Sequence, residues 1–507
     1  MLVKIFGGAV QGIEASIVTV EIAKAGQKDI MVGLPDSAVR ESLLRVYTAV
    51  RNVGLQAFSH VLINLSPADI RKEGTAYDLP IAIGKLFISD QVQDDKLSDY
   101  LLMGELSLDG NLRSIKGALP IALQAKKEGF KGMILPAKSA EEISIVDDFE
   151  VYGMNHLSEV VQFLNGMPKK PLAFKGFELL QQRNHKEHDF SDVKGQANVK
   201  RAMEIAATGG HNLILIGPPG AGKTMLARRL STILPPLSMD EALDTTKIHS
   251  VSAKSTREAG LVSSRPFRSP HHTISDVALV GGGVNPSPGE ISLAHNGVLF
   301  LDELTEFKRS VLEVMRQPLE ERVISISRAK FSVDYPASFM LIASMNPCPC
   351  GYYNHPDKPC VCAPGAVTKY LNKISGPLLD RIDLHVEVTP VSFEELQQER
   401  PQEKSEDIRL RVEKAKGLQL ERYANTKVNA NSAMNSKQLE VHTKLNPEAK
   451  QILANAMEKL GLSARAYDRI KKVSRTIADL EGSEDIQVQH VSEAIQYRSL
   501  DRESWGS

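Results

Sequence analysis

Residues Gly217 to Thr224 read Gly-Pro-Pro-Gly-Ala-Gly-Lys-Thr, which fits the phosphate-loop pattern G-x-x-x-x-G-K-[ST]. The loop follows a short apolar run, Leu213 to Ile216, and precedes the helix-like segment MLARRL. Glycines let the backbone turn its N–H groups toward phosphates, and the N-terminus of the following helix favours negative charge. The order of strand, loop and helix therefore predicts a nucleotide site, formed by Gly217, Pro218, Pro219, Gly220, Ala221, Gly222, Lys223 and Thr224.

The residues around this loop predict the chemistry of the site. Lys223 can reach the β- and γ-phosphates of a nucleotide, and the Thr224 hydroxyl can ligate Mg²⁺. The next buried strand, Val298 to Leu301, ends in Asp302 and Glu303, beside the phosphate site of an open α/β sheet. We expect Asp302 to hold magnesium and Glu303 to polarise the water that attacks the γ-phosphate. The implied cofactors are ATP and Mg²⁺.

Two further side chains complete the predicted site. Asn346 follows a third apolar strand, where a neutral polar group can orient the water or the γ-phosphate. Arg381 lies after an apolar pair in the run SGPLLDRID, residues 375–383. A guanidinium that reaches the γ-phosphate of a neighbouring subunit is an arginine finger, so this placement predicts an oligomer. The predicted catalytic residues are Lys223, Glu303, Asn346 and Arg381.

The composition excludes several classes of protein. The chain has 507 residues, with 61 Lys plus Arg and 62 Asp plus Glu, so its formal charge of −1 gives no overall attraction to nucleic acid or to a membrane. No apolar run approaches the roughly 20 residues of a membrane helix, and residues 1–12 lack the features of a signal peptide. All four cysteines fall between Cys348 and Cys362, which argues against a disulfide framework. We expect a cytoplasmic multidomain protein with no membrane partner.

The chain divides into four parts that differ in composition and in the pattern of their apolar residues. Residues 1–165 alternate strand-like and helix-like segments, such as the alternating apolar and polar run Ile17 to Ile22. Residues 166–188 have the Pro-, Lys-, Gln- and His-rich composition of a linker. Residues 189–392 hold the short apolar runs of buried parallel strands. Residues 393–507 are polar and helical, with three helix-like segments from Asn446 to Leu500. These features predict an α/β fold with a C-terminal helical region.

Residues from about 190 to 500 resemble an AAA+ ATPase of the magnesium-chelatase group. In that group the phosphate loop, the LFLDE strand, the Asn strand end and the LLDRID box recur in this order. The resemblance implies that Asn346 is the sensor-1 residue and that Arg381 is the finger supplied in trans. It also implies a helical lid in which Arg465, with Arg469 as the alternative, contacts the nucleotide. The VKGQ segment, Val193 to Gln196, matches the part that borders the adenine.

An insertion and a hairpin bear on what the ATPase acts on. The stretch Arg257 to Gly283 is long for a minimal phosphate-loop domain, and Glu321 to Tyr335 reads as a hairpin with Arg328 and Lys330 near its tip. Both resemble elements that line the central pore in magnesium-chelatase and MCM helicase rings. A basic tip can contact the phosphate backbone of DNA. The alternative is a solvated hairpin that carries two charges.

The four cysteines form two pairs, Cys348-Pro-Cys350 and Cys360-Val-Cys362. Four thiols this close together in a reducing compartment favour a structural zinc site over disulfides. The C-x-C spacing is tighter than the usual C-x₂-C, and His355 is an alternative to one of the sulfur ligands. Because this loop follows Asn346, zinc would stiffen a segment beside the predicted active site.

The N-terminal block resembles the proteolytic domain of Lon in the stretches Arg71 to Leu86 and Gly104 to Gly117. The alignment puts Ala76 where that family has its nucleophilic Ser, and residues 117–121 contain no lysine where it has its catalytic Lys. A Ser–Lys mechanism needs both groups. We therefore expect an inactive, α+β Lon-protease-like domain with a structural or DNA-side role.

A Lon-like block joined to a chelatase-type ATPase resembles the YifB/ComM family of bacterial competence proteins over nearly the whole chain. The resemblance implies a hexameric, ATP-driven DNA motor: a helicase that binds single-stranded or branched DNA and promotes branch migration during natural transformation, with a recombinase as a further partner. Two alternatives stay open, a magnesium-chelatase-like ATPase subunit that acts on a porphyrin and a protein-remodelling AAA+ ATPase. The chelatase ATPase subunit usually lacks a Lon-like block, which counts against the first alternative.

Overall fold

The computed structural model describes residues 2–498, apart from residues 27, 93–94, 177, 179–187, 253–260, 284–285, 329–330, 392–396, 398–401 and 427. The chain divides into two compact units. The first unit comprises Met1–Arg183 together with Ser238–Ser263 and Ala329–Val333, and the second unit comprises the remainder. Helix α9 (Met239–Val251), which follows the phosphate loop in the sequence, thus belongs to the first unit.

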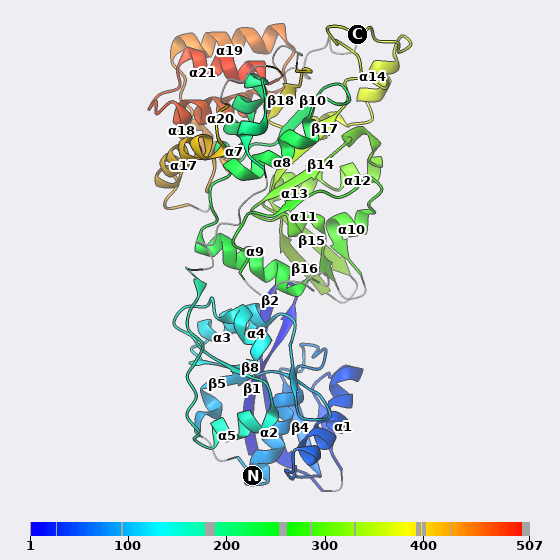
Figure 1. Ribbon diagram of the computed structural model, residues 1–507, viewed down its shortest axis with the longest axis vertical. Coiled ribbons are helices and arrows are strands. Elements are labelled where there is room, and N and C mark those ends of the chain that lie inside the picture. The colour runs from blue at the N-terminus through cyan, green and yellow to red at the C-terminus, as the bar shows by residue number, and fades with distance from the viewer. Residues whose placement is uncertain are drawn as a thin grey trace. The chain divides into compact units, whose positions relative to one another are not determined.

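The first unit is built on a seven-stranded mixed sheet with the order β3-β4-β2-β1-β5-β8-β9 (Figure 1). Its longest strands pair as an antiparallel hairpin, and the predicted strand Ile17 to Ile22 lies in the second of them with Val18, Val20 and Ile22 fully buried. The strands are β1 (Leu2–Gln11), β2 (Glu14–Lys24), β3 (Ile30–Val32), β4 (Val61–Ser66), β5 (Tyr100–Leu102), β8 (Gly132–Pro136) and β9 (Glu150–Met154). A small separate hairpin consists of β6 (Glu105–Leu106) and β7 (Leu112–Arg113).

Three helices of the first unit, α1, α2 and α5, bury their apolar faces with the sheet in one hydrophobic core. Helix α1 begins where the Asp36 carboxylate accepts the backbone N–H of Val39 at 2.7 Å, which satisfies one of the free donors of a helix start. Besides α9, the helices are α1 (Ser37–Asn52), α2 (Asp78–Ile88), α3 (Ala118–Lys127), α4 (Ala137–Ile143) and α5 (Leu157–Leu164).

The second unit contains a five-stranded parallel sheet with the order β11-β14-β17-β10-β18, and Figure 1 shows three of its strands, β10, β14 and β17, side by side. The three apolar runs predicted as strands are all found there, and every residue of β10, β14 and β17 is buried. A sheet covered on both faces selects such wholly apolar strands. The strands are β10 (Leu213–Ile216), β11 (Phe267–Arg268), β14 (Val298–Leu301), β17 (Met340–Met345) and β18 (Leu384–Glu387).

Helices and short connections surround this sheet. The predicted hairpin is present as β15 (Val323–Arg328) and β16 (Phe331–Pro336). Lys330 and the side chain of Arg328 lie outside the described residues. A second small pair consists of β12 (Gly281–Gly282) and β13 (Ser287–Pro288). The helices are α7 (Ala197–Gly209), α8 (Lys223–Ile233), α10 (Asp276–Val280), α11 (Glu290–Leu293), α12 (Arg309–Glu313), α13 (Arg316–Glu321), α14 (Ala366–Leu371) and α15 (Gly376–Leu379).

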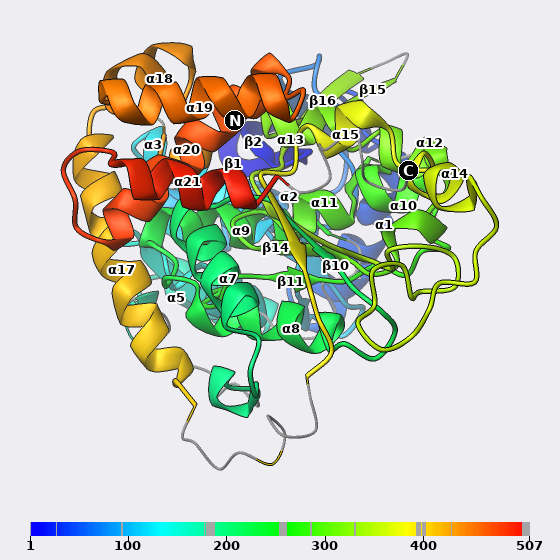
Figure 2. The same ribbon diagram turned by 90° about the horizontal axis from the view of Figure 1, so that it is seen from above.

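A group of C-terminal helices, here called the lid, packs beside α7 and α8 (Figure 2). Buried residues of the sheet, such as Leu213, and of the lid, such as Leu453 and Ile477, belong to one continuous hydrophobic core. Among the described residues, no helix is long and apolar enough to cross a membrane. The lid helices are α17 (Ser405–Arg422), α18 (Ser436–His442), α19 (Pro447–Lys459), α20 (Ala464–Leu480) and α21 (Val488–Gln496).

Candidate nucleotide site

The parallel register of the sheet brings the predicted site residues to one edge. Ile216 is level with Met345, and the backbone N–H of Gly217 donates to the carbonyl oxygen of Met345 at 3.2 Å, so the phosphate loop starts beside Asn346. Leu301 is level with Ala343, so Asp302 follows beside the next residue of β17. Residues more than 100 positions apart therefore meet, as expected for the carboxyl ends of parallel strands.

The phosphate loop has the backbone shape that its glycines permit. Gly220 and Gly222 adopt φ values of 80° and 85°, a region that residues with a Cβ rarely occupy. A Cβ at Gly217 would lie 2.3 Å from the carbonyl oxygen of Val388, so a glycine is needed there for packing. Helix α8 starts at Lys223 and points its free N–H groups back at the loop. This is a cradle for phosphate groups.

The Lys223 ammonium lies inside the cradle. It donates to the carbonyl oxygens of Gly217 and Pro218 at 2.7 and 2.9 Å and to the side-chain oxygen of Asn346 at 3.1 Å. Burial lowers the pKa of Lys223, and the nearby Asp302 and Glu303 carboxylates partly offset that shift. The amine is thus held where the phosphates of a nucleotide would replace its backbone partners.

The residues predicted to hold Mg²⁺ are in direct contact. The Thr224 hydroxyl donates to a carboxylate oxygen of Asp302 at 2.7 Å. The other Asp302 oxygen accepts from the Ser344 hydroxyl, a residue that the sequence analysis missed. A hydroxyl and a carboxylate at a phosphate cradle suit Mg²⁺, which favours oxygen ligands and substrate phosphates. Ser344 could have been recognised as the one hydroxyl in the otherwise apolar strand MLIASM.

Glu303 stands next to this pair with its side chain 60% exposed. Its backbone adopts the left-handed conformation, with φ 54°, and its N–H lies 3.2 Å from Asp302 Oδ1 and 3.3 Å from Ser344 Oγ. The carboxylate lies 3.8 Å from the Nδ1 atom of His272, measured from Glu303 Oε2. His272 lies in the long stretch of residues 257–283, and nothing in the local sequence of that stretch links it to Glu303.

Gln196, the last residue of the VKGQ segment, lies beside the phosphate loop. Its side-chain amide donates to the carbonyl oxygen of Ala221 at 3.0 Å and to that of Thr389 at 3.2 Å. This segment therefore connects the phosphate loop to the chain after β18. The contact agrees with the predicted position of the segment, while its role toward adenine stays a prediction.

The three arginines predicted to reach nucleotide are paired within the chain. Arg381 is 7% exposed and forms an ion pair with Glu320 and a hydrogen bond to the carbonyl oxygen of Pro377. Arg465 is paired with Asp380 at 3.4 Å, and Arg469 with the fully buried Asp383 at 3.0 Å. None of these contacts is to the phosphate loop, so the roles assigned to them stay predictions.

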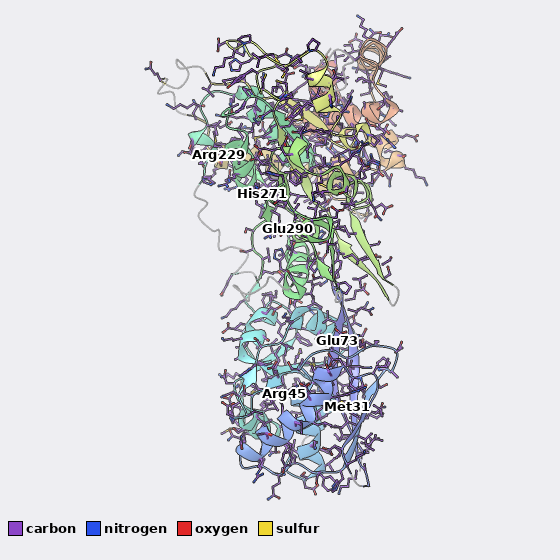
Figure 3. The ribbon with its side chains drawn as sticks, turned by 90° about the vertical axis from the view of Figure 1, so that its right-hand side faces the viewer. Met31, Arg45, Glu73, Arg229, His271 and Glu290 are labelled. Carbon is purple, nitrogen blue, oxygen red and sulfur yellow. The ribbon has the colours of Figure 1, made fainter. Side chains whose placement is uncertain are left out.

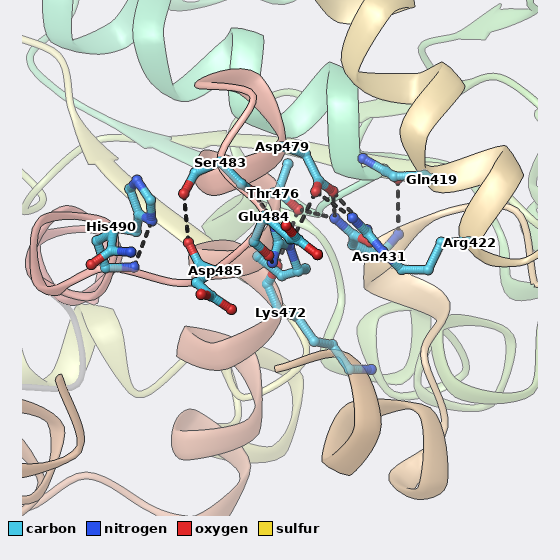
Figure 4. A network of polar contacts seen from close by, with 12 residues as sticks. Gln419, Arg422, Asn431, Lys472, Thr476, Asp479, Ser483, Glu484, Asp485 and His490 are labelled. Atoms are coloured by element: carbon cyan, nitrogen blue, oxygen red, sulfur yellow. Dashed lines mark hydrogen bonds and ion pairs between the residues drawn. The ribbon is translucent and has the colours of Figure 1, made fainter. Parts of the chain in front are cut away.

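Helix α20 contains a stretch rich in basic residues, and part of it is buried. Arg475 is buried and donates to Asp479 and to the carbonyl oxygens of Ser483 and Glu484, three residues that Figure 4 labels. Arg422 binds both oxygens of Asp479 at 2.9 and 2.6 Å. Helical spacing alone does not reveal which charges are buried, and the carboxylate that neutralises them lies four residues beyond Arg475.

The network of α20 continues to the sheet. The amide of Asn431 donates to Thr476 and Asp479 at 3.0 and 2.8 Å, and the Thr476 hydroxyl lies 2.8 Å from His211. His211 in turn lies 3.3 Å from Asp383. Burial acts to raise the pKa of Asp383, but Arg469 and His211 outweigh it and hold the pKa well below its usual range. A chain of buried polar contacts thus joins the lid to the base of the sheet.

The four cysteines converge in one cluster, and all four sulfur atoms lie within 4.8 Å of one another. The separations of Cys348–Cys350, Cys348–Cys360 and Cys350–Cys360 are 3.3, 3.8 and 3.6 Å. Zinc–sulfur bonds of about 2.3 Å in a tetrahedron place the sulfurs about 3.8 Å apart, so the cluster fits a zinc ion. Burial acts to raise the pKa of Cys350, but the backbone N–H groups around it lower the pKa to about 6, which favours a thiolate ligand.

The cysteine loop also contacts the phosphate loop. A Cβ added at Gly351 would lie 2.6 Å from the ring of Pro219, so the two segments pack with no spare room. His355 instead accepts the backbone N–H groups of Asp357 and Lys358 at 3.0 and 3.1 Å. The geometry therefore favours the four-cysteine set over the set that includes His355.

The whole second unit has the architecture of a phosphate-loop protein of the AAA+ class with a helical lid. The family described as "Magnesium chelatase, subunit ChlI" matches residues 189–396, and its C-terminal family matches residues 402–498. A third family, "Subunit ChlI of Mg-chelatase", matches residues 18–139. Together these matches span most of both units.

Full-length relatives narrow the class further. The chain is 43% identical to the competence protein ComM of Haemophilus influenzae over 98% of its own length and 97% of that protein. It is 44% identical to YifB of Escherichia coli, with 97% and 96% coverage. Lon protease 2 of Bacillus subtilis is 28% identical over 157 residues, 28% of this chain and 27% of that protein. The chain belongs to the YifB/ComM family of magnesium chelatase-like AAA+ proteins.

Proposed function

We propose that the protein is an ATPase that moves DNA. One observation supports the ATPase activity. Lys223 contacts Asn346 and Thr224 contacts Asp302, so side chains that follow β10, β17 and β14 meet at one site. In this proposal Lys223 and the loop backbone bind the phosphates. Thr224 and Asp302 would hold Mg²⁺, which would supply positive charge beside the γ-phosphate, and Glu303 would polarise the attacking water.

DNA is the proposed substrate because the chain aligns over nearly its full length with a protein named for competence. By that likeness we infer a cytoplasmic, homohexameric helicase that drives branch migration, with single-stranded or branched DNA and a recombinase as its partners. The net charge of −1 means that a DNA contact has to be made by a local basic surface. The hairpin β15–β16 is the candidate for that surface.

The ATPase rate with and without single-stranded and forked DNA, at two salt concentrations, tests this function. DNA stimulation that falls at higher salt is expected, because phosphate contacts release counterions. A robust ATPase that ignores every DNA would contradict the DNA part and leave the ATPase part standing.

The chelatase family matches favour a second candidate, an ATPase subunit that works on a porphyrin together with partner subunits. Stimulation of the ATPase by a porphyrin and its partner subunits, without any DNA effect, would select it. A protein-remodelling ATPase would respond to neither. The Lon-like block has Ala76 in place of a nucleophile, so we assign the first unit a structural or DNA-side role rather than peptidase activity.

Zinc is the cofactor proposed for the cluster Cys348, Cys350, Cys360 and Cys362. Four protein sulfurs leave no open position, so the ion would be structural. Purified protein is expected to contain one zinc per chain, measured by elemental analysis. Cys360→Ser should lose the metal, whereas His355→Ala, the matched control in the same loop, should keep it. A zinc-free wild-type protein would rule the site out.

A further inference from the structure

The segment Arg265 to Ser275 reads RPFRSPHHTIS. Its position in the fold is determined by the pairing of strand β11 with strand β14. Strand β11 pairs in parallel with β14, with Phe267 level with Val298. Both strands therefore end at the same edge, and the chain that leaves β11 passes the end of β14, where Asp302 and Glu303 lie. His272 follows β11 by four residues and meets Glu303 there.

His272 is held more firmly than the glutamate that it faces. Its side chain is one-third exposed, and its ring packs against His271, with 4.1 Å between centroids, and edge-on against Phe307 at 6.4 Å. Glu303 has a fixed backbone but a long, mostly exposed side chain with several rotatable bonds. Within the described part of the chain, His272 is the one basic side chain that lies within ion-pairing distance of the Glu303 carboxylate.

We propose that His272 is the residue that orients Glu303 for attack on the nucleotide, and so acts as a positioning residue for ATP hydrolysis. The inference rests on the proposed ATPase function. The rate of hydrolysis falls when the carboxylate that must point at the attacking water samples several rotamers. A partner with a fixed position restricts those rotamers. The Nδ1–Oε2 distance of 3.8 Å is longer than a hydrogen bond, as is common for such pairs before substrate tightens them.

The neighbouring histidine provides a matched control. His271 is exposed, and its Nδ1 atom lies 2.9 Å from the Thr273 hydroxyl (His271 is labelled in Figure 3). The two histidines have the same side chain and lie in the same turn. A substitution at residue 271 that keeps the packed ring should therefore leave the catalytic rate unchanged, whereas the loss of the imidazole at residue 272 should lower it.

The test measures kcat and KM for Mg-ATP with the full-length protein, together with the binding of a fluorescent non-hydrolysable ATP analogue and the melting temperature. His272→Ala is expected to lower kcat about tenfold while KM, analogue binding and melting temperature stay unchanged. His272→Asn, which keeps a donor near the position of Nδ1, should recover most of the loss. His271→Phe, which keeps a ring packed against His272, should match the wild type. In a Glu303→Gln background, His272→Ala should have no further effect, since the two residues act together.

Several results would overturn the proposal. They are an unchanged or raised kcat in His272→Ala, an equal loss in His271→Phe, a fall in kcat that persists in His272→Asn, or an additive loss with Glu303→Gln. A wild-type protein that fails to hydrolyse ATP would instead contradict the proposed function itself. Active wild-type enzyme beside an equally active His272→Ala variant would contradict only the role of His272.

Discussion

The phosphate-loop site and helix α20 are both rich in charged residues, yet the two regions hold their charges in opposite ways. At the phosphate-loop site, the Glu303 carboxylate is mostly exposed and its nearest basic partner is 3.8 Å away. In α20, Arg475 and Asp479 are buried and linked by bonds of 3.0 Å or less, together with Arg422. Loosely paired charges remain available to a ligand, whereas fully satisfied buried charges fix a packing arrangement.

A row of basic residues on a helix is therefore weak evidence for a nucleotide contact. The decisive fact is whether the chain supplies its own carboxylates and carbonyls. Substitutions can distinguish residues of the exposed, ligand-binding class from residues of the internally paired class.

Lys223→Ala should give the largest effect, the loss of both nucleotide binding and hydrolysis. The Lys223 ammonium would exchange its carbonyl partners for phosphate oxygens. Removing one such donor costs about 100- to 1,000-fold in rate, and the loss of nucleotide binding adds to this cost. The melting temperature should change little. Analogue binding and ATPase assays check this, and wild-type turnover would contradict the assignment of the site.

Arg381→Ala separates the two classes most sharply, because this arginine is buried and internally paired yet is predicted to act in trans. To reach a neighbouring nucleotide, it must leave Glu320. We expect nucleotide binding to persist and hydrolysis to fall by about 1,000-fold, as for other arginine fingers. Glu320→Ala is the control and should keep its ATPase. Equal losses in both variants would show a purely internal role.

Asp479→Ala should destabilise the second unit by about 3–5 kcal/mol, since it leaves Arg422 and Arg475 buried without their carboxylate. Asp468→Ala is the control, because Asp468 lies on the same helix and is exposed, and it should stay within about 0.5 kcal/mol of the wild type. Denaturant unfolding measures both. A small effect at Asp479 would place α20 in the ligand-binding class after all.

Asp383→Asn should have a smaller effect on the free energy of unfolding, about 2 kcal/mol, and this effect should depend on pH. Its folded-state pKa is depressed, so its stabilising contribution is present above its unfolded pKa of about 3.9 and is lost as the pH falls toward the folded value. The stability difference between wild type and Asp383→Asn should therefore be constant from about pH 7 to pH 5 and shrink below about pH 4. A difference that vanishes already at pH 6 would contradict the depressed pKa.

The sequence predicted what is local or repeated in pattern. The phosphate loop carries its own signature, and the apolar runs that became β10, β14 and β17 needed no tertiary information. Two contacts of Asp302–Glu303, those with Ser344 and His272, depend on strand register and so could not be read from either segment alone. The buried charges of α20 could not be predicted from its own sequence either, because their partners lie in α17 and in residues 483–484.

The hydrophobic core that runs unbroken from the sheet into the lid has a consequence for how the second unit unfolds. Apolar residues from α7, β10 and α8 share one core with those of α17, α19, α20 and α21, and the His211–Thr476 contact crosses the same boundary. Neither part can bury its apolar face without the other. In calorimetric terms, the sheet and the lid should melt as one cooperative transition, and a fragment cut between β18 and α17 should not fold alone.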